Sequence, residues 1–219
     1  MVQPTMDGTR MLRKALLTAC TLSLSFLAGC ASQPSVTEFQ CRAGDWQTIG
    51  MRDGSQGLPR TNLLRHQEAC GPFGIVPERA EYVAGWEQGL TTFCTADNGF
   101  SLGERGGKHH NVCDSAEFVE AYNDGRTLFQ ARQEVRQLEQ KIAAQEQRLI
   151  DIRQEIIGVT TAQLVPDLTV SERVALVAKF ESLVEERQHV TEGMPKLRRQ
   201  LARSQQSLEQ LNLDLAYAH

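Results

Sequence analysis

The spacing of apolar residues predicts a long helix in the C-terminal half of the chain. From Leu128 onward, apolar residues recur at alternating steps of three and four among Gln, Glu, Arg and Lys, which are strong helix formers. One heptad position holds Leu128, Val135, Ile142, Leu149 and Ile156, and the other holds Ala131, Leu138 and Ile152. A heptad pattern of this length is typical of a coiled coil.

A second heptad pattern begins after Pro166. Its apolar positions are Leu176, Phe180, Leu183, Val190, Met194, Leu197, Leu201, Leu208, Leu211 and Leu215. Gly158 and Pro166 mark a turn between the patterns, and Pro195 is expected to kink or briefly break the second helix. The two helices are of similar length, which favours an antiparallel hairpin over residues 128–219. The alternative is that both helices pair with another chain.

The N-terminal half carries a spaced small-residue motif. In three copies, a small residue stands four positions before a glycine: Gly50 and Gly54, Gly85 and Gly89, and Ala121 and Gly125. Residues four apart share one face of a helix, so the motif predicts grooves in which another backbone approaches closely. The final glycines are 35 and 36 residues apart, a period that suggests helix-turn-helix repeats.

Helix-start signals agree with this motif. Asp45 is expected to cap a helix over residues 46–54, and Pro77 opens a second helix. Residues 114–117 resemble a capping box at the start of a third helix. Between them, residues 98–107 are too rich in glycine for a helix, and we expect a loop there.

The first 30 residues have the features of a lipoprotein signal peptide. Arg13 and Lys14 precede an apolar run that is too short to span a bilayer, which takes about 20 residues. The run ends in a lipobox at residues 27–30 (Leu-Ala-Gly-Cys), where small residues precede the cysteine. We therefore interpret residues 1–29 as a removed signal peptide and Cys30 as the lipidated residue. An ordinary secretory signal and an uncleaved anchor are the alternatives.

Lipidation would place the protein on a membrane. Two or three acyl chains such as palmitate on Cys30 give effectively permanent anchoring. Ala31 replaces the aspartate that commonly retains lipoproteins at the inner membrane, so by resemblance to lipoproteins we expect the outer membrane, facing the periplasm. The polar residues 30–40 are expected to form a tether between the lipid and the domain.

The cysteines predict disulfides. Of the six, Cys20 lies in the signal peptide and Cys30 receives the lipid; the other positions are Cys41, Cys70, Cys94 and Cys113. An even number of cysteines in an exported chain is typical of disulfides. Three pairings are possible, and we favour Cys41–Cys70 with Cys94–Cys113 because each closes a local loop.

A zinc site is the alternative use of some of these residues. Its ligands would be Cys94, His109, His110 and Cys113. The spacing fits no standard zinc motif, so we expect no metal and interpret the two histidines as a solvated pair in a loop.

Charge and motifs exclude several functions. Without residues 1–29 the chain has 20 Lys and Arg against 26 Asp and Glu, a net charge of −6, with no basic cluster. This charge argues against nucleic acid as a partner. Because hydrolase, metalloprotease and nucleotide fingerprints are missing from the sequence, we expect no cofactor and no catalytic residues. An enzymatic interpretation would depend on His109 or His110.

Glycine and cysteine spacing resembles a known family. The pattern joins Trp46, Gly50, Asp53, Gly54 and Gly57, then Tyr82, Gly85, Gly89, Leu90, Phe93 and Cys94, then Gly99, Gly103, Gly106, Val112 and Cys113. Over about residues 40–128 it resembles the domain-of-unknown-function 2799 family of bacterial lipoproteins. The resemblance implies export and paired cysteines, and it supplies no catalytic residues.

These features together predict an all-α protein. A small disulfide-stapled helical domain over residues 41–127 is followed by the coiled-coil hairpin over residues 128–219. We expect a non-enzymatic envelope protein that binds an envelope partner, or itself, through the coiled coil. The alternatives are an arm that acts as a spacer, and a binding module for a small molecule or cell-wall fragment. The module would use Trp46, Trp86, Tyr122 and His109.

Overall fold

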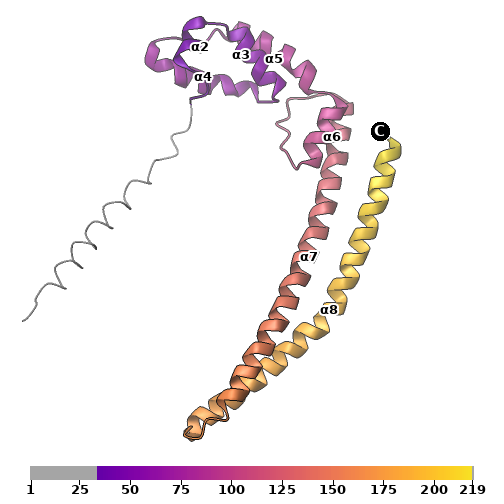
Figure 1. The fold of residues 1–219 in the computed structure, drawn as a ribbon. Coiled ribbons are helices and arrows are strands. Elements are labelled where there is room, and N and C mark those ends of the chain that lie inside the picture. Colours follow the sequence, from indigo (N-terminus) through magenta and orange to yellow (C-terminus); the bar gives the residue numbers. More distant parts are fainter. Residues whose placement is uncertain (1–33, 219) are drawn as a thin grey trace, which may run out of the picture.

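The computed structural model describes residues 34–218, so the predicted signal peptide and Cys30 lie outside the described residues. Its helices are α2 (Glu38–Ala43), α3 (Trp46–Ser55), α4 (Leu63–Cys70), α5 (Arg79–Phe93), α6 (Ala96–Glu104), α7 (Ala116–Ala162) and α8 (Val170–Ala218), with 3₁₀ turns η1 (Arg60–Asn62) and η2 (Gly71–Phe73). The predicted all-α class is confirmed. Elements α2 to α5 form an N-terminal unit, and α7 and α8 form a long arm (Figure 1). Among the described helices, none combines the length and apolarity needed to cross a membrane.

Helices α3 and α5 pack through their glycines, as the spaced motif predicts. A Cβ atom on Gly54 would overlap the carbonyl oxygen of Trp86, and one on Gly89 would overlap that of Met51. Gly50 and Gly85 face the opposite helix in the same way. The two backbones therefore touch without side chains between them, which only glycine permits.

Helices α6 and α7 pack in the same manner, and the loop expected over residues 98–107 is wrong for most of its length. Gly103 faces the carbonyl oxygen of Tyr122, and Gly125 faces that of Phe100. Each glycine costs the helix about 1 kcal/mol relative to alanine. The close contact with α7 offsets this cost, so α6 is helical despite its composition.

The two helix pairs are copies of one arrangement. In the first, Gly57 has φ of +67° and lies against the ring of Phe93; in the second, Gly106 has φ of +71° and lies against Phe129. Trp86 Nε1 donates to the carbonyl of Leu58 at 2.8 Å, and Tyr122 Oη donates to that of Gly107 at 3.0 Å. The repeat unit is thus a helix pair, and the three-copy motif of the sequence missed its fourth member in α6.

Caps and disulfides hold the ends of these helices. Asp45 accepts a hydrogen bond from the amide of Thr48 and caps α3 as predicted, and Ser115 caps α7. The disulfides Cys41–Cys70 and Cys94–Cys113 confirm the favoured pairing. In the chain-entropy model, closing a loop of this size adds roughly 3 kcal/mol of stability.

The fold begins before the end of the tether expected over residues 30–40. Helix α2 starts at Glu38, with a capping box formed by Thr37 and Gln40. Val36 is buried in the core of the N-terminal unit. Only the residues before position 35 therefore separate Cys30 from the folded domain. At the other end, the expected boundary between residues 127 and 128 lies inside α7, which continues from the second helix pair into the arm.

The arm is the predicted antiparallel hairpin, with α7 of 47 residues and α8 of 49 residues. Its core consists of heptad residues: Leu128, Val135, Leu138 and Ile152 from α7, and Leu183, Val190 and Met194 from α8. Arg148 forms two hydrogen bonds of 2.7 Å with Glu186 across the hairpin. Such exposed pairs help to define the register more than they add stability. Pro195 does not interrupt α8, which bends near its middle (Figure 1).

Replacing Gly54 by alanine is expected to destabilise the protein by about 2 kcal/mol or more, because backbone atoms of α5 must move. Gly158 in α7 has no neighbour within 4 Å of its added Cβ, so Gly158→Ala is the matched control and should raise stability by about 0.5–1 kcal/mol. Thermal unfolding followed by circular dichroism measures both. Equal midpoints for Gly54→Ala and the parent would contradict the close helix contact.

Candidate functional site

A buried polar cluster lies between α3, α4 and α5, and its centre is Asp53, which is 1% exposed. One oxygen of its carboxylate, Oδ2, accepts hydrogen bonds from Asn62 Nδ2 at 2.5 Å and from Tyr82 Oη at 2.9 Å. The same oxygen lies 2.7 Å from His66 Nε2. The other oxygen accepts from the guanidinium of Arg52 at 3.1 Å. The carboxylate is therefore fully hydrogen-bonded.

Hydrogen bonding keeps Asp53 ionised. Burial by itself raises the pKa of this carboxyl group, but hydrogen bonds from His66, Asn62 and Tyr82 lower it more and bring the pKa from 3.8 to about 2. Burial and the nearby carboxylate raise the pKa of Tyr82 well above its ordinary value. The cluster is thus a neutral phenol and a charged carboxylate held in one fixed arrangement.

Ser35, His66 and Asp53 lie in a line that resembles the order of groups in a serine hydrolase. Ser35 Oγ lies 2.8 Å from His66 Nδ1, and the other ring nitrogen faces Asp53. Two observations favour a structural role. His66 is 1% exposed and both its nitrogens are engaged, so a substrate could reach only the half-buried Ser35. The contact between Ser35 and His66 also fixes the start of the folded chain against α4, since Val36 enters the core directly after Ser35.

The sequence analysis named Asp53 only as part of the glycine and cysteine spacing and did not single out His66. A signal was present, because Asp53 follows Trp46 by seven residues and shares the buried face of α3 with it and with Ile49. A carboxylate on an apolar helix face requires buried partners. What the sequence could not show was which residues of α4 and α5 supply them.

The residues of the predicted binding module do not form one exposed surface. Trp46 is 3% exposed and Trp86 is 9% exposed, and both belong to the core of the N-terminal unit. His109 and Tyr122 do come together, with ring centroids 5.3 Å apart, and His109 also contacts the ring of Phe118. His109 is half-buried, so the expectation of a solvated histidine pair holds only for His110.

The zinc alternative is contradicted, because Cys94 and Cys113 are bonded to each other. Within residues 34–218, no cluster of three or more His, Cys, Asp or Glu side chains has the arrangement of a metal site.

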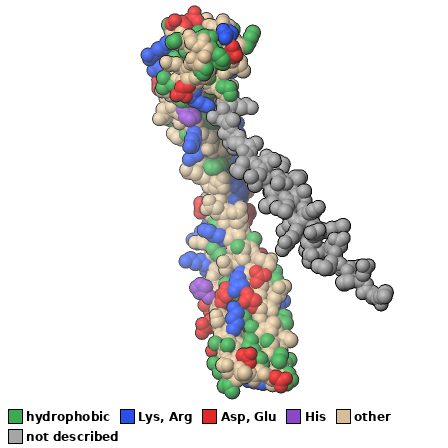
Figure 2. All heavy atoms as spheres, turned by 90° about the vertical axis from the view of Figure 1, so that its left-hand side faces the viewer, with side chains coloured by type: hydrophobic (Ala, Val, Ile, Leu, Met, Phe, Trp, Pro, Cys, Tyr) green, Lys and Arg blue, Asp and Glu red, His purple; other side chains and the backbone are tan. Residues whose placement is uncertain are grey.

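The distal part of the arm exposes a set of large apolar side chains, which we call the distal apolar face: Ile150, Ile157, Leu164, Val165, Val170, Val174 and Val177. Ile157 is 60% exposed, Leu164 78% and Val170 80%. Charged side chains lie among the apolar ones at this end of the molecule (Figure 2). Contiguous exposed apolar residues usually mark an interaction site.

Heptad geometry places much of this face on one side of the hairpin. Ile150 and Ile157 each follow a heptad position of α7, while Val177 follows the heptad position Leu176 of α8. In an antiparallel pair, the positions that follow the core positions of the two helices lie on the same side. Ile152 is fully buried in the hairpin core, whereas these side chains are exposed and form an apolar surface outside it.

Replacing Asp53 by asparagine is expected to destabilise the protein by roughly 2–4 kcal/mol above pH 4, because three buried donors lose their ionic acceptor. A carboxyl group with a lowered folded pKa adds stability above its unfolded pKa, and this stability is lost as the pH falls through the folded value. The difference from the parent should therefore shrink by about 2 kcal/mol between pH 4 and pH 2. Urea unfolding across this range measures it, and a constant difference would contradict the assignment.

Comparison of the chain with curated proteins and with solved structures found no match. A family model does match residues 45–127, the segment that holds Asp53, His66 and the glycines of both helix pairs. The match agrees with the family that the glycine and cysteine spacing suggested. The model that matches residues 45–127 is that of the family described as "Protein of unknown function (DUF2799)".

Proposed function

We propose that this chain is a lipid-anchored, non-enzymatic protein of the bacterial outer membrane that binds a protein partner in the periplasm through the distal apolar face of its arm. The observation that carries the proposal is the exposure of that face. Its valine, isoleucine and leucine side chains are exposed, whereas Ile152 and Leu183 of the same hairpin are fully buried.

The shape of the arm supports a role in binding at a distance. Helices of this length extend about 70 Å, at 1.5 Å per residue. The N-terminal unit and the distal apolar face lie at opposite ends of the molecule (Figure 1). A protein held to a membrane through Cys30 could therefore reach a partner well beyond the head groups.

The charge around the face favours a protein over a membrane as its occupant. Between residues 150 and 181 the acidic side chains are Asp151, Glu155, Asp167, Glu172 and Glu181, and the basic ones are Arg153, Arg173 and Lys179. Surfaces that bind anionic lipids are rich in lysine and arginine instead. Mixed charges at the rim of an apolar face are typical of protein interfaces.

Two features support a role without catalysis. The buried Asp53 cluster uses its hydrogen bonds to join α3, α4 and α5. The aromatic residues of the alternative binding module are used for packing, with the indole of Trp86 bonded to the backbone of Leu58.

The lipid anchor is tested by metabolic labelling with a palmitate analogue. Labelling of the parent protein and its loss in Cys30→Ser are expected, because the sulfur of Cys30 is the predicted acceptor. Cys20→Ser is the matched control and should keep the label. A labelled Cys30→Ser variant would refute the lipobox interpretation.

The binding role is tested by photo-cross-linking in living cells from residues of the distal apolar face, such as Val174 and Ile157. Both positions are expected to trap the same envelope protein, since they lie on one surface. Gln205, exposed on α8 outside that surface, is the control and should trap little. Trapping of another copy of the chain would assign the face to self-association, and equal yields at all three positions would refute a specific interface.

A further inference from the structure

Most of the exposed large apolar side chains of the N-terminal unit lie near the point where the chain enters the fold. These residues form what we call the proximal patch: Phe39, Leu64, Phe73 and Val76. Phe39 is 80% exposed and Val76 is 76% exposed. In α3 and α5, by contrast, Met51 is the only large apolar side chain recorded as exposed among the described residues. Because the exposed apolar side chains are concentrated on one side of the unit, we infer that this side contacts another surface.

The elements that carry the proximal patch are joined to one another. The disulfide between Cys41 and Cys70 links α2 to the end of α4, and the guanidinium of Arg42 lies 5.8 Å from the ring centre of Phe73. Leu64 and Val76 line a hollow of about 520 Å³, and both also line a neighbouring hollow of about 560 Å³. The patch is therefore carried by α2, α4, η2 and the loop after η2, which are tied together by the disulfide and by these contacts.

The short connection to Cys30 brings this surface close to the expected lipid. The folded chain is fixed against α4 from Ser35 onward, by the contact with His66 and by the burial of Val36. Five residue steps separate Cys30 from Ser35, and an extended chain advances at most about 3.6 Å per residue. Cys30 can thus lie no farther than about 18 Å from Ser35, which contacts α4, so this part of the unit must stay near the bilayer surface.

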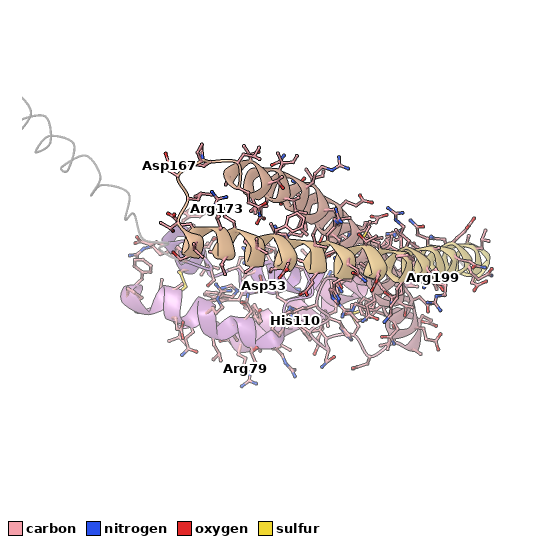
Figure 3. All side chains as sticks on the ribbon, turned by 90° about the horizontal axis from the view of Figure 1, so that it is seen from below. Asp53, Arg79, His110, Asp167, Arg173 and Arg199 are labelled. Carbon is pink, nitrogen blue, oxygen red and sulfur yellow. A yellow bond between two sulfur atoms is a disulfide. The ribbon has the colours of Figure 1, made fainter. Side chains whose placement is uncertain are left out.

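Two arginines beside the patch suit phospholipid head groups, although Glu38, Glu68 and Glu78 also lie near it in the chain. Arg60 and Arg79 line the hollow of about 520 Å³ beside Leu64, and neither has an ion pair within the described part of the chain. The guanidinium of Arg60 lies over the ring of Trp86, and Arg79 points away from the unit, whereas Asp53 lies inside it (Figure 3). Glu68 lines the neighbouring hollow and is the acidic side chain there. Arginines next to exposed apolar side chains match the phosphate and glycerol level of a bilayer.

We propose that the proximal patch rests on the phospholipid surface that holds the lipid of Cys30. The inference depends on the proposed lipid anchor, and it adds a second contact that a flexible tether alone would not give. The lipid supplies the attachment, while the patch fixes how the N-terminal unit, and with it the arm, is oriented on the membrane.

The test uses the full lipidated protein in vesicles of phosphatidylethanolamine and phosphatidylglycerol that contain brominated lipid, a quencher of tryptophan fluorescence. Leu64→Trp and Val76→Trp each add one exposed indole at the patch, above a constant background from the buried Trp46 and Trp86. Met51→Trp on α3 is the matched control. Quenching of the added fluorescence is expected to be at least threefold stronger at positions 64 and 76 than at position 51.

Several outcomes would overturn the proposal. Equal quenching at all three positions would show that the unit has no fixed orientation. A photo-cross-linker at Leu64 that traps a protein and leaves lipid unlabelled would assign the patch to a protein partner. Failure of the lipid anchor is recognised separately, because the parent protein would then be washed from membranes at high salt and alkaline pH. Circular dichroism of each variant checks that the helices are retained.

Discussion

Close contact between helix backbones is the constraint on which the rest of this structure depends. In both helix pairs, glycines on one helix face carbonyl oxygens of the other, as Gly54 faces Trp86 and Gly103 faces Tyr122. This contact buries little side-chain volume in a small unit, so the disulfides supply the stability that a larger core would otherwise give. Because α7 continues from the second contact into the arm, the same contact sets the direction in which the arm leaves.

The buried Asp53 cluster connects the start of the folded chain to this framework. It joins α3 to Tyr82 of α5 and to His66 of α4, and His66 in turn holds Ser35. A carboxylate with complete hydrogen bonding can be buried at acceptable cost, whereas one that has lost a partner cannot. The cluster therefore fixes the position of the N-terminal segment as well as the packing of three helices.

Local signals were sufficient wherever a pattern repeats along one helix. The heptads predicted both arm helices, and Asp45 and the small-residue motif predicted α3 and its close contact. The helix α6 was missed because its glycines lower helix propensity, and only their packing against α7 makes the helix stable. The buried role of Asp53 was missed for a similar reason, since its partners Asn62, His66 and Tyr82 lie 9, 13 and 29 residues away.

The sequence by itself determined the helical class, the favoured disulfide pairing, the hairpin and the family resemblance of residues 45–127, because each depends on spacing along the chain. Tertiary structure alone decided which side chains remain in contact with water. Trp46 and Ile157 are both large apolar residues in helical patterns, yet one is buried and the other is 60% exposed. The difference arises because burial depends on which helix packs against each face, and that is settled only when segments distant in the sequence meet.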